Sequence, residues 1–135
     1  MREVGIVGVG HTKFGKTEQN FLDLLGEAAL LCLDDAGLSP GPPAKIDQVF
    51  VASMGAAMVS RVSGSASALA DSLNLCPAMA ECVENGPASG ASAVKLGYMA
   101  IASGMCDCVL VVGGEKMNGR GGAAATDFVS TMLHP

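Results

Sequence analysis

Residues 84–92, Glu-Asn-Gly-Pro-Ala-Ser-Gly-Ala-Ser, form the junction at which this sequence most clearly places chemistry. An apolar run over residues 78–83 leads in, and an apolar helical segment leads out from residue 88 to a stop at Gly104. Such a strand-turn-helix junction directs backbone N–H groups and the positive end of the helix dipole at one point, which favours an anion such as a thiolate. Because enzymes place nucleophiles at such points, we take this junction as the candidate site.

Two side chains at the centre of the junction define what it can do. Pro87 has no thiol and no backbone N–H, so it supplies neither a nucleophile nor an oxyanion donor. Proline is favoured at the first position of a helix, and a structural helix start is the interpretation that the residues favour. Ser89 is the candidate for a substitute nucleophile, although no activating base is visible beside it in the sequence.

The five cysteines predict structural thiols and no metal site. Cys106 and Cys108 stand two apart around an aspartate, whereas metal sites usually pair Cys-x-x-Cys with further Cys or His ligands. We therefore expect all five to be buried, with the side chain of the third pointing into the sheet. The cysteines are Cys32, Cys76, Cys82, Cys106 and Cys108.

Residues 10–17 fit the phosphate-loop pattern Gly-x-x-x-x-Gly-Lys-Thr and follow an apolar run, so a nucleotide binder is an alternative. The pattern lacks its usual surroundings, because bulky Phe14 lies beside Gly15 and helical periodicity begins only at Phe21. No later strand ends in an aspartate placed to hold magnesium. His11, inside the pattern, is expected to be a loop or surface imidazole.

Strand-like runs alternate with helical segments along the whole chain. Predicted strands cover residues 4–10, 47–53, 78–83 and 106–112, and predicted helices cover residues 21–36, 65–73, 88–103 and 126–133. Asn20 and Gly37 are the expected caps of the first helix. This order predicts an α/β fold: a mostly parallel sheet of strands buried on both faces, with helices on both faces of the sheet.

Three segments together resemble the thiolase superfamily. They are Val-Glu-Asn-Gly-Pro-Ala-Ser-Gly at residues 83–90, Ala-Ile-Ala-Ser-Gly at residues 100–104 and Val-Leu-Val-Val-Gly-Gly-Glu-Lys-Met at residues 109–117. The resemblance is to the acetyl-CoA acetyltransferases and sterol-carrier-type thiolases, and it runs from residue 2 to about residue 132. It implies that residues 1–135 are a partial thiolase N-terminal domain, an incomplete first half of a thiolase-like fold.

The resemblance also implies an activity and a departure from it. Family members are acyl-CoA C-acyltransferases whose substrate is a coenzyme A thioester, with no permanently bound cofactor. Their nucleophilic cysteine corresponds to Pro87, and their catalytic histidine, in an Asn-Glu-Ala-Phe type motif, has no counterpart here. The chain alone is therefore expected to be inactive. A Cys-less retro-aldol acyl-CoA lyase and a non-catalytic thiolase-like subunit remain the alternatives.

Side chains after the predicted strands could line an acyl site, because sites in α/β folds gather at the carboxyl ends of parallel strands. Met54, Met58 and Met117 could form an apolar, adaptable wall for an acyl chain, with ordinary core packing as the alternative. The Glu115-Lys116 pair is expected to lock a loop rather than to line a pocket.

Composition limits the environment and the partners. The 135 residues suit one domain, and a net charge of −5 without a basic stripe predicts no nucleic-acid partner. No secretory signal or membrane-length apolar stretch is visible, and five thiols suit a reduced, cytoplasmic protein. Incomplete packing should leave apolar helix faces and a strand edge exposed. The resemblance implies a homodimer, or a hetero-oligomer with a thiolase-like or zinc-ribbon/β-barrel partner.

Overall fold

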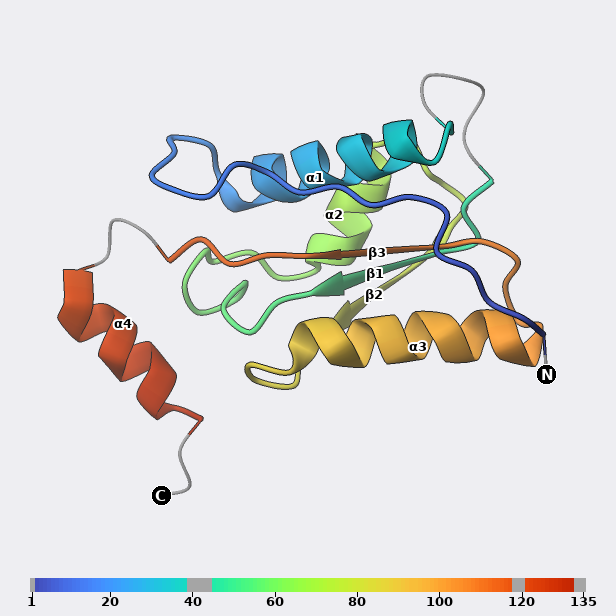
Figure 1. The fold of residues 1–135 in the computed structure, drawn as a ribbon. Coiled ribbons are helices and arrows are strands. Elements are labelled where there is room, and N and C mark those ends of the chain that lie inside the picture. The colour runs from blue at the N-terminus through green and yellow to red at the C-terminus, as the bar shows by residue number, and fades with distance from the viewer. Residues whose placement is uncertain (1, 39–44, 118–120, 133–135) are drawn as a thin grey trace.

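A parallel three-stranded sheet lies between two layers of helices (Figure 1) in the computed structural model, which describes residues 2–38, 45–117 and 121–132. The elements are α1 (Phe21–Asp35), β1 (Gln48–Ala52), α2 (Ser65–Ser72), β2 (Met79–Val83), α3 (Ser89–Ser103), β3 (Val109–Gly113) and α4 (Gly121–Ser130). Helices α1 and α2 cover one face of the sheet and α3 covers the other (Figure 1). The predicted class, a parallel α/β sheet with helices on both faces, is confirmed.

Strand β1 is central, in the order β2-β1-β3, and all five of its residues are buried. Its Gln48 lies opposite Met79 of β2 and Val109 of β3. Strand β2 differs from the expectation of strands buried on both faces, since Glu81 and Cys82 are exposed. The prediction is wrong for β2, which lies at the edge of the described sheet with a neighbouring strand on one side only.

Side-chain alternation divides the core into two layers. Towards α1 and α2, one cluster joins Leu25, Leu33, Val49, Val51, Leu69, Leu110 and Val112, among others. Towards α3, a smaller cluster joins Phe50, Ala52, Val83 and Ala93, with Val109 and Val111 packed against it. The sheet is therefore shared by both layers of the core, and its strands end where the candidate site begins.

Helix α1 begins as the sequence predicts. The Asn20 side chain accepts the Asp23 N–H at 3.0 Å, and the Asp23 carboxylate accepts the Asn20 N–H at 3.2 Å, which completes a capping box. The helix ends one residue before the expected bound, with Ala36 as its cap and Gly37 following at φ 69°. Its buried residues recur at every fourth position, as expected of one helix face: Phe21, Leu25, Ala29 and Leu33. Leu31 lies off this face and is 45% exposed.

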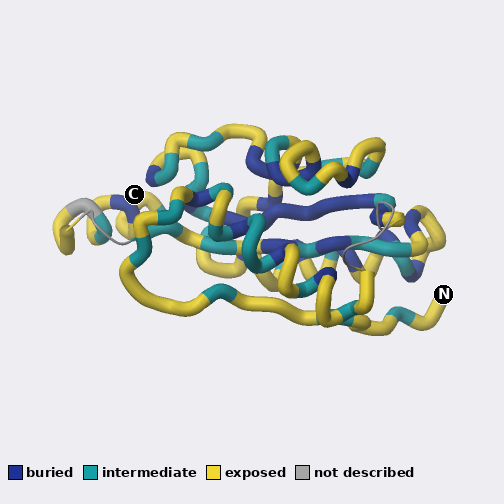
Figure 2. The backbone as a smooth tube through the Cα atoms, turned by 90° about the horizontal axis from the view of Figure 1, so that it is seen from above, coloured by how far each residue is buried: buried dark blue, intermediate teal, exposed yellow. Residues whose placement is uncertain are grey.

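Residues 4–10, predicted as the first strand, pair with no strand in the structure. They run as an extended segment along α1, with Ile6, Val7 and Val9 exposed (Figures 1 and 2). Gly8 and Gly10 pack so closely that a Cβ atom on either would lie within 2.5 Å of a backbone atom of Cys32. The prediction is wrong because an apolar run can pair only where a neighbouring edge is within reach, and a cavity separates this segment from β3.

Other bounds shift at the ends of elements. Strand β3 begins at Val109 rather than at 106, because the Asp47 carboxylate accepts the N–H groups of Asp107 and Cys108 at 2.8 and 2.9 Å. Helix α4 starts at 121, five residues before the expected bound, and ends at 130. Helix α3 agrees within one residue and ends at Gly104, whose φ is 85°. Of the described helices, none is long and apolar enough to cross a membrane.

Candidate functional site

The junction between β2 and α3 has the predicted strand-turn-helix form. Strand β2 ends at Val83 and α3 begins at Ser89, at the end of the sheet to which the strand arrows point (Figure 1). Gly86 turns the chain at φ 52°, and its N–H donates to the Glu84 carboxylate at 2.8 Å. The turn is thus held by its own polar groups, and it presents the start of a fifteen-residue helix at one end of the sheet.

Ser89 is held inside the turn. Its side chain is buried at 4% exposure, and its hydroxyl donates to the Gly86 carbonyl at 2.6 Å while accepting the Asn85 N–H at 2.8 Å. Within the described residues, no His, Lys, Asp or Glu side chain bonds to this hydroxyl. These contacts favour a role in fixing the turn, and the idea of Ser89 as a nucleophile stays a prediction.

Pro87 is exposed at a cavity of about 420 Å³. The cavity is lined by Met54, Met58, Glu84, Asn85, Gly86, Pro87, Phe128, Thr131 and Met132. Two of the three methionines proposed from the sequence, Met54 and Met58, thus line the same cavity as Pro87. Met117 is described, and it is not among the lining residues.

The sequence analysis missed two apolar side chains at this cavity, Phe128 in α4 and Met132 just beyond its end. Phe128 is 5% exposed, and Met132 lies close enough to Gly86 that a Cβ atom there would be 3.6 Å from its sulfur. The apolar periodicity of this segment could have indicated a buried face. It could not have indicated which residues that face meets, since the contact spans more than 40 residues of sequence.

Glu115 holds the methionine-bearing loop against the end of β3. Its carboxylate accepts the Ser53 hydroxyl at 3.0 Å, the Met54 N–H at 2.5 Å and the Gly55 N–H at 3.1 Å. Charge-assisted bonds to three donors make this a strong clamp. The expectation that Glu115 locks a loop is confirmed, and the loop that it locks carries one wall of the cavity.

Lys116 clamps a second loop. Its ammonium donates to the carbonyls of Thr17 and Gln19 at 2.6 and 2.5 Å, which ties the segment before α1 to the end of β3. This contact weakens the phosphate-loop alternative, because the loop turns carbonyl groups towards a cation where a phosphate would need N–H groups. Helix α1 starts only at Phe21, and Phe14 is 91% exposed. His11 is exposed, as expected of a loop imidazole.

Three of the cysteines are shielded in the way that structural thiols are. Cys106 is buried, and Cys32 and Cys108 are half-buried. Burial raises the pKa of the Cys106 thiol above its ordinary value, and the Asp47 and Asp107 carboxylates raise it further. Burial likewise raises the pKa of Cys32 and of Cys108. These thiols therefore stay protonated at neutral pH, which suits packing rather than nucleophilic attack.

The prediction of burial is wrong for Cys76 and Cys82, which are exposed. Cys82 lies on the edge strand β2, and its side chain turns to the start of α2. There its sulfur lies 3.4 Å from the Ser65 hydroxyl and accepts the Ala66 N–H at 3.4 Å. The sulfur thus replaces the side-chain cap that this helix lacks. Across the described residues, no three His, Cys, Asp or Glu side chains group so as to hold a metal ion.

Comparison with known proteins identifies the family of the chain. The sequence model of the thiolase N-terminal domain matches residues 4–135. The chain therefore belongs to the thiolase family.

Two relatives agree with this assignment, and a solved structure resembles the fold. The chain is 38% identical over 118 residues to the acetyl-CoA acetyltransferase of Methanothermobacter thermautotrophicus, covering 87% of this chain and 30% of that protein. It is 34% identical to sterol carrier protein 2 of Gallus gallus, covering 86% and 20%. The chain thus spans less than a third of the length of these relatives. The fold also resembles 3-oxoacyl-[acyl-carrier-protein] synthase III of Aquifex aeolicus, with a TM-score of 0.64 at 23% identity over 75% of this chain and 31% of that one.

Proposed function

We propose that this chain forms the acyl-binding part of a thiolase-type C-acyltransferase that uses coenzyme A thioesters, and that no acyl-enzyme forms at position 87. The observation that carries the proposal is the cavity that Pro87, just before the start of α3, lines together with Met54 and Met58. Two relatives named acetyl-CoA acetyltransferase, 38% and 37% identical to this chain, support the substrate class.

The chemistry of the cavity separates binding from covalent transfer. Methionine and phenylalanine side chains offer an apolar, adaptable surface to an acyl group. The start of α3 offers a positive field to the thioester oxygen. Pro87 supplies neither a thiol nor an N–H, so the site can bind and polarise a thioester without accepting its acyl group.

Calorimetric titration of the chain with acetyl-CoA and with free coenzyme A tests this proposal. We expect acetyl-CoA to bind more tightly, and Met58→Glu to weaken binding about tenfold or more, because it places a carboxylate against the acyl group. Met99→Glu is the matched control, since Met99 is 54% exposed and Met58 is 58% exposed, and Met99 does not line the cavity. No binding of acetyl-CoA, or equal losses in both variants, would contradict the proposal.

Pro87 also supports a second candidate function. A thiolase-type chain without a nucleophile at this position could belong to a retro-aldol acyl-CoA lyase, or it could serve as a non-catalytic subunit of an active thiolase. Either candidate requires association, as a homodimer or with a thiolase-like or zinc-ribbon/β-barrel partner in the cytoplasm. The exposed edge of β2 supports association. Purification from the native source distinguishes the candidates: lyase activity in the isolated complex supports the first, and a partner with cysteine at the matching junction supports the second.

A further inference from the structure

The N-terminal loop, residues 10–19, contains the phosphate-loop pattern, and the proposed function gives this pattern no role. The loop lies at the end of the sheet to which the strand arrows point, where α3 also begins (Figure 1). Lys116 holds the carbonyls of Thr17 and Gln19, so the backbone there turns oxygen atoms rather than N–H groups to a charged partner. What the N-terminal loop offers to a ligand is therefore its side chains.

Two rings stack within the N-terminal loop. The ring centroids of His11 and Phe14 lie 6.2 Å apart, with 28° between the ring planes. His11 Nδ1 donates to the Thr12 carbonyl at 3.0 Å, which orients the imidazole ring. Phe14 is 91% exposed although it stacks on His11, so its ring remains open to a further planar group. An exposed aromatic ring of this kind is a stacking platform for a nucleotide base.

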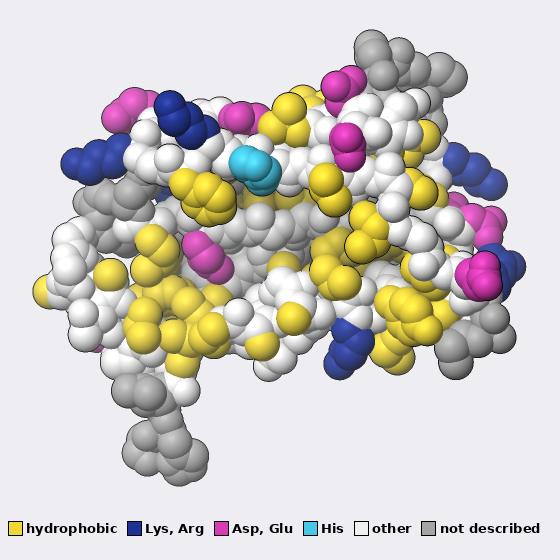
Figure 3. Space-filling model, in the orientation of Figure 1, with side chains coloured by type: hydrophobic (Ala, Val, Ile, Leu, Met, Phe, Trp, Pro, Cys, Tyr) yellow, Lys and Arg dark blue, Asp and Glu magenta, His cyan; other side chains and the backbone are white. Residues whose placement is uncertain are grey.

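Two exposed lysines, Lys13 and Lys16, flank Phe14. In the described part of the chain, neither of them forms an ion pair. Residues 10–19 hold these two lysines and one acidic residue, Glu18, whereas the whole chain holds 8 basic and 13 acidic residues. Figure 3 shows Lys and Arg side chains at the end of the molecule where this loop lies. The N-terminal loop is therefore a region of positive charge on an acidic protein, and it suits an anionic ligand.

The base of the N-terminal loop is fixed relative to the cavity that Met54 lines. Lys116 anchors the loop to the end of β3, and the Gln19 side chain donates to the Glu27 carboxylate of α1 at 2.7 Å. Glu115, adjacent to Lys116, accepts the Met54 N–H. Neighbouring residues after β3 thus hold both the loop and the cavity lining, so a ligand that spans the two would meet a preorganised surface.

We propose that the N-terminal loop binds the nucleotide end of coenzyme A, with the adenine ring on Phe14 and the phosphate groups at Lys13 and Lys16. The proposal rests on the proposed function, in which the cavity at Pro87 takes the acyl end of the same molecule. A coenzyme A thioester has a planar base and several phosphate charges at one end and an acyl group at the other, joined by a flexible arm. The loop and the cavity match these two ends in chemistry, and both lie at the same end of the sheet.

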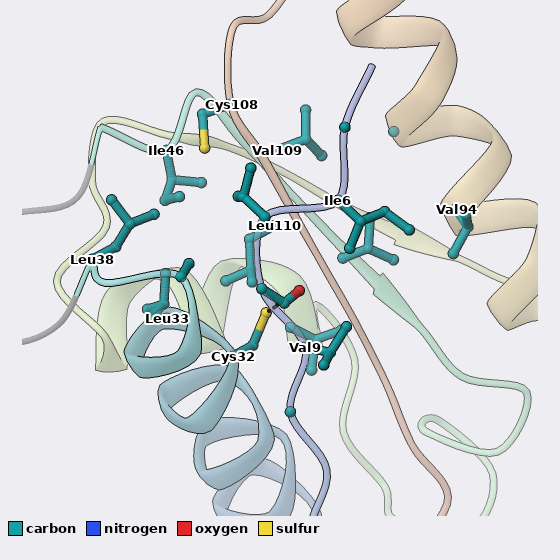
Figure 4. A pocket seen from close by; sticks show the side chains of 18 of the residues that line it. Ile6, Val9, Cys32, Leu33, Leu38, Ile46, Val94, Cys108, Val109 and Leu110 are labelled. Carbon is teal, nitrogen blue, oxygen red and sulfur yellow. Dashed lines mark hydrogen bonds between the residues drawn. The ribbon is translucent and has the colours of Figure 1, made fainter.

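A second cavity is unsuited to the nucleotide. It has a volume of about 520 Å³ and lies between β3 and residues 4–10, with Ile6, Val9 and Val94 among its lining residues (Figure 4). None of the described residues that line it carries a charged side chain. Phosphate groups placed there would lose their hydration without gaining a cation, at a large cost in free energy.

Calorimetric titration with ADP tests the loop apart from the acyl site, because ADP has the base and the pyrophosphate but neither the arm nor the acyl group. We expect ADP to bind, and Phe14→Leu to weaken its binding about tenfold, because leucine is apolar but has no ring. Phe14→Tyr is the matched control and should bind ADP as wild type does, because it keeps the ring.

The lysines are tested in the same titration. Replacing Lys13 and Lys16 together by glutamine should weaken ADP binding about tenfold or more, because it removes both charges that meet the phosphates. Lys95→Gln, at an exposed position of α3, is the control and should change the affinity little. Coenzyme A should bind more tightly than dephospho-coenzyme A, which lacks the phosphate on the ribose.

The two ends of the ligand give separate outcomes. Met58→Glu should leave ADP binding unchanged, and Phe14→Leu should weaken coenzyme A and acetyl-CoA by the same factor. If ADP binds but acetyl-CoA gains nothing over coenzyme A, the acyl site is contradicted and the loop proposal stands. If Phe14→Leu binds acetyl-CoA as wild type does, the loop proposal is overturned and the acyl site stands.

Three further results would overturn the loop proposal. The first is that ADP does not bind. The second is that magnesium-ATP binds more tightly than coenzyme A, which would indicate a free nucleotide as the ligand. The third is that vesicles of anionic phospholipid bind the chain in a way that depends on Phe14 while coenzyme A does not, which would indicate a membrane surface.

Discussion

At the scale of single residues, position 87 determines what the junction can do. A cysteine at the start of a helix gains thiolate character from the helix field, whereas a proline gains nothing from it. Ser89 is close by in the sequence, but both of its hydrogen-bonding roles are taken up by the turn. The residue type at 87 was readable from the sequence. The engagement of Ser89 was not, because it depends on how Gly86 turns the chain.

Thiol labelling of the folded chain tests the assignment of the cysteines. We expect Cys76 and Cys82 to react with iodoacetamide first, because both are exposed. Cys106 should react last, because it is buried and because burial and neighbouring carboxylates raise its pKa. Peptide mapping by mass spectrometry after short exposures measures the order. Rapid labelling of Cys106 under conditions where the fold persists would contradict the assignment.

The free energy of unfolding should depend on pH in the acid range through the Asp47 carboxyl group. Hydrogen bonds from the backbone N–H groups of Cys108 and Asp107 hold the pKa of its carboxyl below the ordinary value. A pKa lowered by folding contributes stability above the unfolded pKa, and that contribution is lost as the pH falls through the folded pKa. Asp47→Asn should therefore lower the free energy of unfolding at pH 7, and its difference from wild type should shrink in acid. Urea titrations across this pH range measure it.

The control for that series is Asp71→Asn, at an exposed position of α2. This change should alter the free energy of unfolding little, because substitutions at exposed positions without specific contacts usually have small effects. The opposite result is a difference in the free energy of unfolding between Asp47→Asn and wild type that stays constant from neutral pH into acid. It would show that the start of β3 does not depend on this carboxylate.

At the scale of elements, prediction from sequence succeeded where the signal was local. Helix α3 was placed within one residue because an apolar segment ends at Gly104, which adopts a left-handed conformation. The start of α1 was found from the Asn20 cap. Prediction failed for residues 4–10, since an apolar run reports burial but cannot report whether a neighbouring strand is present. The sequence also did not predict that α4 lies beside the cavity at Pro87, because that contact joins residues far apart in the chain.

Asn20→Ala tests how far the local signal stabilises α1. The substitution removes the acceptor for the Asp23 N–H and half of the capping box. It should lower the free energy of unfolding by about 0.5–2 kcal/mol. Asn20→Asp should restore most of the loss, because a carboxylate caps a helix start as well as an amide does. Chemical denaturation measures both variants. An alanine variant as stable as wild type would show that packing alone holds the start of α1.

At the scale of the whole molecule, two cavities have different characters. The cavity at Pro87 lies where the strands end, and its lining combines methionine and phenylalanine side chains with the polar residues Glu84, Asn85 and Thr131. A second cavity, of about 520 Å³, lies between β3 and residues 4–10. Membership of the thiolase family was readable from three short segments together. The cavity between β3 and residues 4–10 was not, since it depends on how closely Gly8 and Gly10 pack against α1.

The most direct test of the account is the acylation state of the chain after it has bound acetyl-CoA. Wild-type protein is incubated with acetyl-CoA at a concentration where calorimetry detects binding, and residues 84–92 are then mapped by mass spectrometry. Pro87→Cys, treated with iodoacetamide, is the control which shows that a modified junction peptide can be detected. The account predicts binding with no acyl group on the wild-type junction, because Pro87 cannot accept one. An acyl group on Ser89 would contradict it.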